Sequence, residues 1–507
     1  TNEIWSDEHN WQFRARATDT ADMDVPRGRV TGGSSAINGQ IFIRGIPEDY
    51  DNWAEWGNDE WKFRNLIPYF NKIETDTTYK DNPGDFHGSD GPIVMHRFPR
   101  DEWTQGSKAF EEACLNAGFP LCEDANAPGT TGVSPMPLNN PSGVRWSTAI
   151  GYLGLSRHRL NLTIRANVSV KRILFDRSGA KPRATGVEAV SDGEEFVIEG
   201  EEIILSAGAI GSPHILMLSG VGPYEHLKEL RIDVVKDLPG VGENLHDHPI
   251  MPMNWGFKNN DMSFSKYQRI DRAIIVGLQY IFFKKGVTSA PFWSTNLFHS
   301  IREKEMPELQ IFMTPMCFKE EKYTSSFNLD NLLNFGSLFF ARGKKAFPGL
   351  HFQINLLRPK STGTVRLKSS NPDEDLQINP NWFSDLSDMD DLLEGMKHTR
   401  EVLSKPSLSK IVSDELLPGK NIKNDEDMKE SIRNHVQTGH HPASTCAMGS
   451  DNNKLAVLDE KLRVKGIKNL RVVDASSFPD MISGNINASV IMLAEKAADM
   501  ILADQIN

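Results

Sequence analysis

The feature that most constrains this chain is a short apolar run that ends at a glycine and leads into a helical pattern. Residues 202–206 (EIILS) have the length and composition of a buried strand. Gly208 follows, and the apolar spacing from Ser212 to Leu218 predicts a helix. A strand that leads into a helix through such a turn is typical of doubly wound α/β sheets. We expect Ser212 to cap this helix, whose first amides would then face an anionic cofactor.

A second unit of the same kind lies near the C-terminus. Residues 469–473 (NLRVV) predict a strand that ends at Asp474, and apolar spacing predicts a helix over about 489–502. Both strands therefore belong to one Rossmann-like, cofactor-binding domain.

A chain of 507 residues exceeds what one hydrophobic core usually serves, so we expect at least two domains. Residues 353–357 and 363–367 predict antiparallel strands and residues 388–403 a helix, which indicates a second, α+β domain built on an antiparallel sheet. We assign residues 1–46, 147–250 and 431–507 to the cofactor domain, and residues 47–146 and 251–430 to the substrate domain.

Composition excludes several other classes of protein. The net charge of -12 argues against nucleic acid as a partner. The cysteines form no CxxC pair, which favours a reduced, cytoplasmic setting and no cysteine-rich metal site. The longest apolar run, residues 273–283, is too short to span a membrane and predicts a buried or interfacial helix. The first residues, TNEIWSDEHNW, show no secretory signal.

Four further segments contain the residues that suggest chemistry. Residues 28–45 (GRVTGGSSAINGQIFIRG) offer backbone freedom and exposed amides suited to a cofactor, the alternative being a flexible surface turn. Residues 238–249 (LPGVGENLHDHP) place His246 and His248 around Asp247, but an HxH pair in a glycine-rich loop is more often structural than metal-binding. Residues 438–449 (TGHHPASTCAMG) and 483–488 (SGNINA) bring histidines and asparagines near the C-terminal helix.

Together with residues 208–222 (GAIGSPHILMLSGVG), these segments resemble the signatures of the glucose–methanol–choline (GMC) oxidoreductase family, in particular its choline dehydrogenase-like and alcohol oxidase-like members. The resemblance implies bound FAD, held non-covalently because Ile37 stands where covalent relatives have a histidine. It places cofactor contacts at Arg27, Gly32, Gly33, Ser34, Asn38, Gly39, Val170, Ala207, Gly208, Ser212, Asp474, Ala475, Asn485, Ile486 and Asn487.

The resemblance also places the catalytic histidine at His441 and its asparagine partner at Asn485. Alcohol oxidation needs a base for the hydroxyl proton while hydride leaves for flavin N5, and a histidine suits the first task. A second polar group that holds the alcohol oxygen keeps the C–H bond aimed at the flavin. The alternative is a surface histidine and an asparagine that caps the last helix. Because residues 440 and 441 would point to opposite sides of an extended loop, only one should face the flavin.

We therefore expect oxidation of a primary or secondary alcohol to an aldehyde or ketone, with electrons passed to O₂ or another acceptor. The alternatives are a hydroxynitrile lyase, a fatty-acid photodecarboxylase or a flavin-free, truncated protein; the paired His441 and Asn485 favour redox chemistry. Some aromatic and apolar residues suggest a pocket for an aliphatic or aromatic alcohol, although they would also suit an ordinary core: Phe282, Phe283, Phe292, Trp293, Phe312, Met316 and Phe318.

One family element, the βαβ unit with GxGxxG, has no counterpart before Pro26. We expect a separate N-terminal chain or fragment, or a piece missing from this sequence, to complete the FAD site, because a sheet without that unit would expose an edge. The alternative is a protein that naturally lacks the unit and cannot hold FAD alone.

Overall fold

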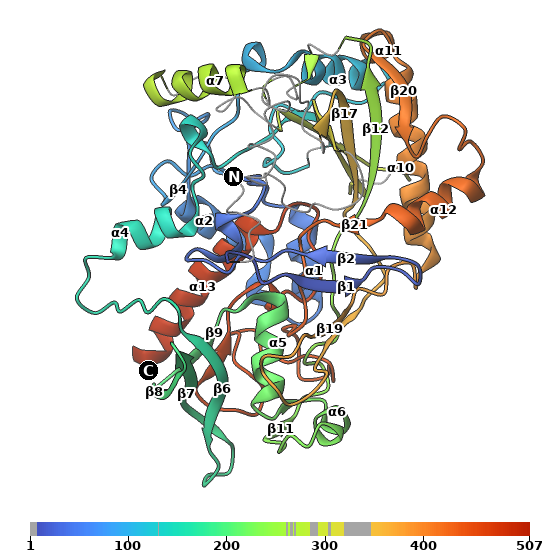
Figure 1. The fold of residues 1–507 in the computed structure, drawn as a ribbon. Helices are drawn as coiled ribbons and strands as arrows, with labels where there is room; N and C mark the ends of the chain where they lie inside the picture. The colour runs from blue at the N-terminus through green and yellow to red at the C-terminus, as the bar shows by residue number, and fades with distance from the viewer. Residues whose placement is uncertain are drawn as a thin grey trace.

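The computed structural model describes residues 8–129, 131–259, 262–263, 267, 270–283, 293–302, 306–318 and 346–506. The described residues form a mixture of helices and sheets (Figure 1). A large antiparallel sheet occupies one half of the molecule, and a parallel pair of strands with two helices occupies the other.

The large sheet has seven strands in the order β20-β12-β17-β14-β13-β5, with β21 paired to β12. Apolar and polar side chains alternate along its strands, as expected where one face of a sheet packs on apolar residues and the other face does not. In β17, Leu350, Phe352 and Ile354 are fully buried on one face, and His351 and Gln353 lie on the other. The strands are β5 (Gly132–Pro135), β12 (Pro249–Phe257), β13 (Thr295–His299), β14 (Leu309–Thr314), β17 (Gly349–Leu356), β20 (Val412–Leu417) and β21 (Gln437–Thr438).

Helices α3 (Gln105–Asn116) and α10 (Leu386–Ser404) pack on the apolar face of this sheet. The side chain of Asp385 caps α10 by accepting a hydrogen bond from the amide of Ser387 at 2.9 Å. Gly395 allows a close approach, since a Cβ there would lie 2.7 Å from the side chain of Ile354. The polar face of the sheet is thereby turned toward the rest of the molecule.

The other half contains the two strand–helix units predicted from the sequence. Strands β9 (Ile203–Leu205) and β22 (Leu470–Val472) pair in parallel, and helices α5 (Gly208–Leu218) and α13 (Asn487–Ile506) follow them. Both predicted strands and both predicted helices are confirmed. A three-stranded antiparallel sheet lies beside them, with β6 (Ser169–Asp176), β7 (Arg183–Ser191) and β8 (Glu194–Glu199).

The predicted strands at 353–357 and 363–367 and the predicted helix at 388–403 are present, but the two strands belong to different sheets. The second forms β18 (Thr364–Arg366) in a four-stranded sheet with β19 (Gln377–Asn379), β1 (Phe13–Arg16) and β2 (Asp22–Val25). The remaining regular elements are short or lie at the periphery: α1 (Pro47–Glu55), α2 (Phe63–Ile73), α4 (Gly154–Ser156), α6 (Tyr224–Glu229), α11 (Pro406–Ser409), α12 (Asp425–His435), β3 (Glu74–Asp76), β4 (Ile93–Met95), β10 (Val221–Gly222), β11 (Lys236–Asp237), β15 (Cys317–Phe318) and β16 (Ala346–Phe347).

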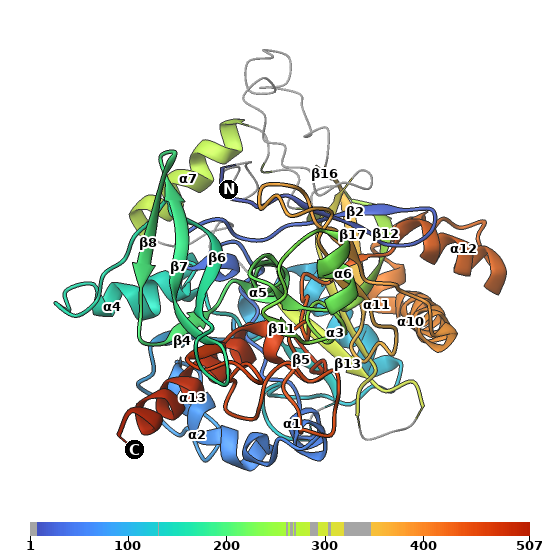
Figure 2. The same cartoon turned by 90° about the horizontal axis from the view of Figure 1, so that it is seen from below.

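The apolar run at 273–283 forms part of helix α7 (Ile270–Phe283), which lies on the surface in both views (Figures 1 and 2). The prediction that it could be buried is wrong, because Ile281, Phe282 and Phe283 are 63%, 72% and 71% exposed. Across the described residues, no helix has both the length and the hydropathy needed to cross a bilayer.

Candidate active site

A cavity of about 1990 Å³ lies between the polar face of the large sheet and the parallel β9–β22 pair. This is larger than a typical small-ligand pocket of about 300–1,000 Å³, so it has room for a dinucleotide together with a substrate. Its walls come from segments far apart in the sequence, namely residues 26–41, 168–171, 206–218, 437–442 and 473–498 and the strands β12, β14 and β17.

Helix α5 begins at one wall of the cavity. Gly208 has a positive φ of 79° and nothing within 4 Å of its missing Cβ, so the backbone is open toward the cavity. Its amide donates to the carboxylate of Asp474 at 2.9 Å. The predicted capping role of Ser212 is wrong: the helix begins four residues earlier, and the Ser212 hydroxyl is fully buried, where it donates to Asp474 and accepts from the amide of Ala207.

The glycine segment forms a second wall of the cavity. Gly32 and Gly33 have φ values of 93° and 53°, which glycine adopts without strain. The hydroxyl of Ser34 accepts a hydrogen bond from the amide of Gly28 at 3.2 Å. The guanidinium of Arg145 donates to the side-chain oxygen of Asn38 at 2.7 Å. The turn is therefore held in one shape by its own side chains and by residues distant in the sequence.

The structure brings nearly all the predicted cofactor residues to this one cavity. Ser212 is the exception, since it does not line the cavity and instead positions Asp474. The residues that do line it are Arg27, Gly32, Gly33, Ser34, Asn38, Gly39, Val170, Ala207, Gly208, Asp474, Ala475, Asn485, Ile486 and Asn487.

The predicted catalytic pair is assembled at hydrogen-bond distance. Asn485 Nδ2 lies 3.0 Å from His441 Nε2, and His441 Nδ1 lies 2.9 Å from His248 Nδ1. The Nε2 of His248 lies 3.1 Å from the carbonyl oxygen of Ile482. A carbonyl can only accept, so His248 carries its proton on Nε2 and accepts at Nδ1. It follows that His441 carries its proton on Nδ1, and that its unprotonated Nε2 accepts the hydrogen bond from Asn485 Nδ2.

The surroundings keep this base neutral. Burial, with the nearby His248, His440 and Arg27, holds the pKa of His441 well below its usual value, and burial lowers the pKa of His248 to about 4. Behind the histidine, the carboxylate of Asp247 accepts the backbone amide of His441 at 2.9 Å and the hydroxyl of Thr438. Burial raises the pKa of Asp247 to about 6. Near neutral pH, His441 is therefore ready to accept a proton.

His440 and His441 both line the cavity. His440 has a positive φ of 63°, so the alternation of an extended strand does not apply there, and the side chain that faces the flavin stays a prediction. The guanidinium of Arg27 donates to the carbonyl of His440 at 2.8 Å, which fixes this conformation.

Two buried amide atoms at the start of α13 have no protein partner among the described residues. They are Asn485 Oδ1 and Asn487 Nδ2, and both residues line the cavity. Buried polar atoms are nearly always hydrogen-bonded, so these atoms indicate a polar ligand. The amino end of α13 lies beside them and favours negative charge. An acceptor, a donor and a helix amino end suit the polar edge and the anionic reduced state of a flavin.

Residues 238–249 contain the part of the site that the sequence did not reveal. The prediction that the HxH pair is structural left His248 and Asp247 without a function, whereas the structure places both against His441. The sequence HDHP at residues 246–249 was the only local indication of a function here. It does not show which distant residue these side chains contact.

The predicted aromatic pocket is only partly present. Trp293, Phe312 and Met316 line the cavity near the polar face of the sheet, with the rings of Trp293 and Phe312 at 89° and 4.9 Å. Phe282 and Phe283 lie on the exposed surface of α7, away from it. Phe292 and the side chain of Phe318 lie outside the described residues.

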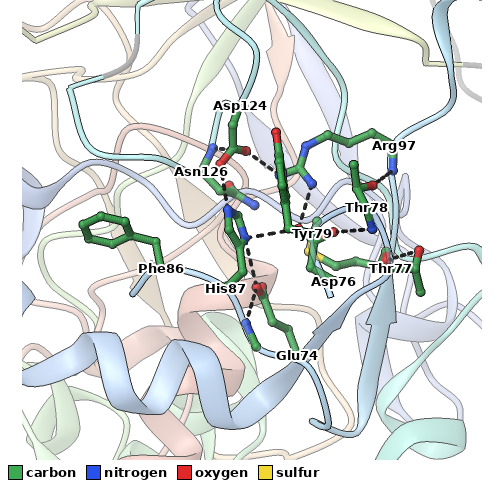
Figure 3. Close-up of polar contacts among 12 residues, drawn as sticks. Glu74, Asp76, Thr77, Thr78, Tyr79, Phe86, His87, Arg97, Asp124 and Asn126 are labelled. Carbon is green, nitrogen blue, oxygen red and sulfur yellow. Dashed lines mark hydrogen bonds and ion pairs between the residues drawn. The ribbon is translucent and has the colours of Figure 1, made fainter. Parts of the chain in front are cut away.

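A second cluster of titratable side chains lies away from this cavity, around His87 (Figure 3). We call it the His87 ion cluster; it consists of Arg44, Glu74, Asp76, His87, Arg97 and Asp124. The ligand atoms of Glu74, Asp76 and His87 lie within 4.8 Å of one another, as metal ligands do. However, two guanidiniums already pair with the three carboxylates, and a protonated His87 makes the cluster neutral. We interpret it as an ion network that stabilises the fold.

The comparisons with known proteins agree with this geometry. Residues 14–250 and 359–494 match the two models of the GMC oxidoreductase family. The chain is 34% identical to the oxygen-dependent choline dehydrogenase of Photobacterium profundum, covering 98% of this chain and 84% of that protein. It is also 34% identical to the mitochondrial choline dehydrogenase of Homo sapiens, over 98% of this chain and 80% of that one. The crystal structure of pyridoxine 4-oxidase from Mesorbium loti superposes with a TM-score of 0.80 at 26% identity, covering 98% and 89% of the two chains.

The fold and the cavity define a flavin-dependent oxidoreductase with a Rossmann-like FAD-binding part and a sheet-rich substrate part. The chain belongs to the GMC oxidoreductase family. It is an FAD enzyme that oxidises alcohols and passes the electrons to an acceptor.

Proposed function

We propose that this protein oxidises its alcohol with His441 as the base and Asn485 as the group that orients the alcohol oxygen. The single observation that carries this proposal is the 3.0 Å hydrogen bond from Asn485 Nδ2 to the unprotonated Nε2 of His441. An incoming alcohol replaces this bond: its O–H donates to Nε2, and its oxygen accepts from the Asn485 amide. One group then removes the proton and the other fixes the carbinol carbon.

The proton stays on the protein after transfer. His441 becomes an imidazolium that still donates from Nδ1 to His248, and the Asp247 carboxylate near its backbone stabilises the positive charge. FAD, when bound in this cavity, would supply the acceptor for the hydride of the carbinol carbon. The alcohol thereby loses one proton to His441 and one hydride to the cofactor, which leaves an aldehyde or ketone.

We propose that FAD occupies the cavity non-covalently. Ile37 lines the cavity at the position before Asn38, and its aliphatic side chain has no nucleophile with which to form a flavin bond. The cofactor residues that line the cavity support this placement, with Val170 at the adenine end and Asn485–Asn487 at the flavin ring.

The proposed domain division follows the same boundaries as the sequence prediction: residues 1–46, 147–250 and 431–507 around the cofactor, and the remainder around the large sheet. Within the described residues β9 pairs only with β22, and Ile204 is 44% exposed. We propose that this edge receives the βαβ unit with the phosphate-binding glycines, from residues outside this sequence or from a separate chain.

The test is single-turnover flavin reduction without oxygen. Replacing a general base typically costs about 10²–10⁴-fold in rate. We expect His441→Ala to slow flavin reduction by that factor while FAD remains bound. Asn485→Ala should cost less, since the proton acceptor remains. His440→Ala is the matched control; if it stopped flavin reduction while His441→Ala did not, the assignment of the base would be wrong.

Because the relatives are named as choline dehydrogenases, choline is the first alcohol to test on this protein. The relative from Photobacterium profundum is named as oxygen-dependent, so oxygen is the first electron acceptor to test. Whether choline suits this chain depends on the sheet face that closes the cavity.

A further inference from the structure

The polar face of the large sheet closes the substrate end of the cavity with uncharged carboxamides. Gln437 on β21, Ile250 on β12 and Asn355 on β17 lie side by side in one row of paired residues. Gln353 and Phe312 are paired in the adjacent row. All five residues line the cavity. Two inter-strand spacings, about 10 Å, separate Asn355 from Gln437, which lies four residues before His441. Ile250 also lies two residues after His248, whose Nδ1 is 2.9 Å from His441 Nδ1, so this row and the base border the same part of the cavity.

A buried network fixes how these carboxamides are turned. His351 Nδ1 lies 2.7 Å from Asn254 Oδ1, so this nitrogen donates, and His351 Nε2 accepts from Gln353 Nε2 at 3.2 Å. Burial lowers the pKa of His351 to about 4, so the ring stays neutral. In the next row, Asn355 Nδ2 donates to the carbonyl of Gln310 at 3.2 Å. The amide nitrogens of Gln353 and Asn355 are thus engaged within the sheet, and both residues line the cavity.

The charged residues of the cavity lie elsewhere. Asp373, which Glu374 and Asp375 follow directly in the chain, pairs with Lys171 at 2.6 Å beside Val170, at the proposed adenine end. The carboxylate of Asp474 accepts a hydrogen bond from the amide of Gly208 at the start of α5. Glu495, on α13, accepts a hydrogen bond from the hydroxyl of Tyr152. Among the described residues that line the sheet end, none is a carboxylate. A quaternary ammonium that leaves water needs a carboxylate or an enclosure of aromatic faces. Here Trp293 and Phe312 pack edge to face on each other as an apolar wall.

We infer that the alcohol oxidised at this site carries an uncharged hydrogen-bond donor, such as a second hydroxyl, where choline carries its quaternary ammonium. The carboxamide oxygen of Asn355 accepts from that donor, and the wall of Trp293 and Phe312 covers the carbon skeleton. This inference rests on the proposed function, because His441 must receive the other end of the molecule.

Three alcohols of one shape test the inference on the FAD-loaded protein. The first is choline, and the second is neohexyl alcohol, in which a carbon replaces the nitrogen. The third is the diol made from neohexyl alcohol by exchanging one methyl of its quaternary carbon for hydroxyl. Dissociation constants come from the change in the visible flavin spectrum, and flavin reduction is followed separately without oxygen. We expect the diol to bind at least about 10-fold more tightly than choline, with neohexyl alcohol between them.

A variant of Asn355 separates loss of its hydrogen bond to the ligand from a general loss of structure. Asn355→Leu should weaken binding of the diol by about 10-fold and leave neohexyl alcohol nearly unchanged, since one hydrogen bond is lost. If the variant fails to fold, the order of the three ligands on the unaltered protein still decides.

Tightest binding of choline would overturn the inference, and so would tightest binding of neohexyl alcohol, which would show a purely apolar site. Either result together with normal flavin reduction leaves alcohol oxidation at His441 intact. If the dissociation constants follow the expected order but no alcohol reduces the flavin, only the proposed function is overturned.

Discussion

Replacing His87 by glutamine should destabilise the protein at neutral pH through loss of one buried positive charge. Burial alone would lower the pKa of His87, but hydrogen bonds and charges from Asp124, Asp76 and Glu74 outweigh it and raise the pKa to about 10. A rise from 6.5 to about 10 corresponds to at most about 5 kcal/mol. The His87 side chain is 8% exposed, and solvent screening reduces this figure. We therefore expect a loss of about 2–3 kcal/mol.

The loss appears as a lower melting temperature. Unfolding entropy is about 2.1 cal/mol/K per residue, which for 507 residues unfolding together gives about 1 kcal/mol/K. His87→Gln should therefore lower Tm by about 2–3 °C, measured by differential scanning calorimetry. His158→Gln, at an exposed histidine, is the matched control and should leave Tm unchanged.

The pH dependence distinguishes charge from packing. The pKa of His87 is higher in the folded than in the unfolded state, so its stabilisation is complete below about pH 6.5 and is lost as the pH rises toward 10. The difference in Tm between variant and wild type should be full at about pH 6 and nearly absent at about pH 10. An equal difference at both pH values would refute the charge argument. A chelator that lowers the wild-type Tm would instead show a metal at the His87 ion cluster.

Other predictions concern the active site. The rate constant of flavin reduction should stay level from about pH 8 down to about pH 6.5 and fall only in more acidic solution, since the pKa of His441 lies well below its usual value; in stopped-flow measurements, a fall that begins above pH 7 would contradict a neutral, buried base. His248→Phe should slow flavin reduction by up to about 10²-fold because His441 loses the acceptor that fixes its tautomer, whereas His248→Asn should restore part of the rate. Equal rates in both variants would show that the tautomer does not matter. Acid or heat denaturation should release the flavin into the supernatant, and flavin that stays with the precipitate would show a covalent bond and contradict the argument from Ile37.

The sequence by itself determined the parts of this protein that depend on local signals. The strand at 202–206, its turn at Gly208 and the helix after it follow from a short apolar run, a residue that tolerates positive φ and a helical spacing. The motifs around His441 and Asn485 were equally visible, because each occupies a few consecutive residues. Even there the exact start of α5 was missed: Ser212 could cap a helix by its chemistry, but the carboxylate of Asp474, 262 residues away, engages its hydroxyl.

Only the tertiary structure decided which residues act on one another. The neutral base depends on His248, which is 193 residues from His441 in the chain, and on the carbonyl of Ile482 behind it. The sequence likewise predicted a strand at 353–357 without showing that Gln353 and Asn355 face the cavity. A tautomer, a pKa and the chemistry of a pocket wall depend on charges, burial and hydrogen bonds through space. A local pattern specifies the conformation of its own segment, and packing alone determines its neighbours.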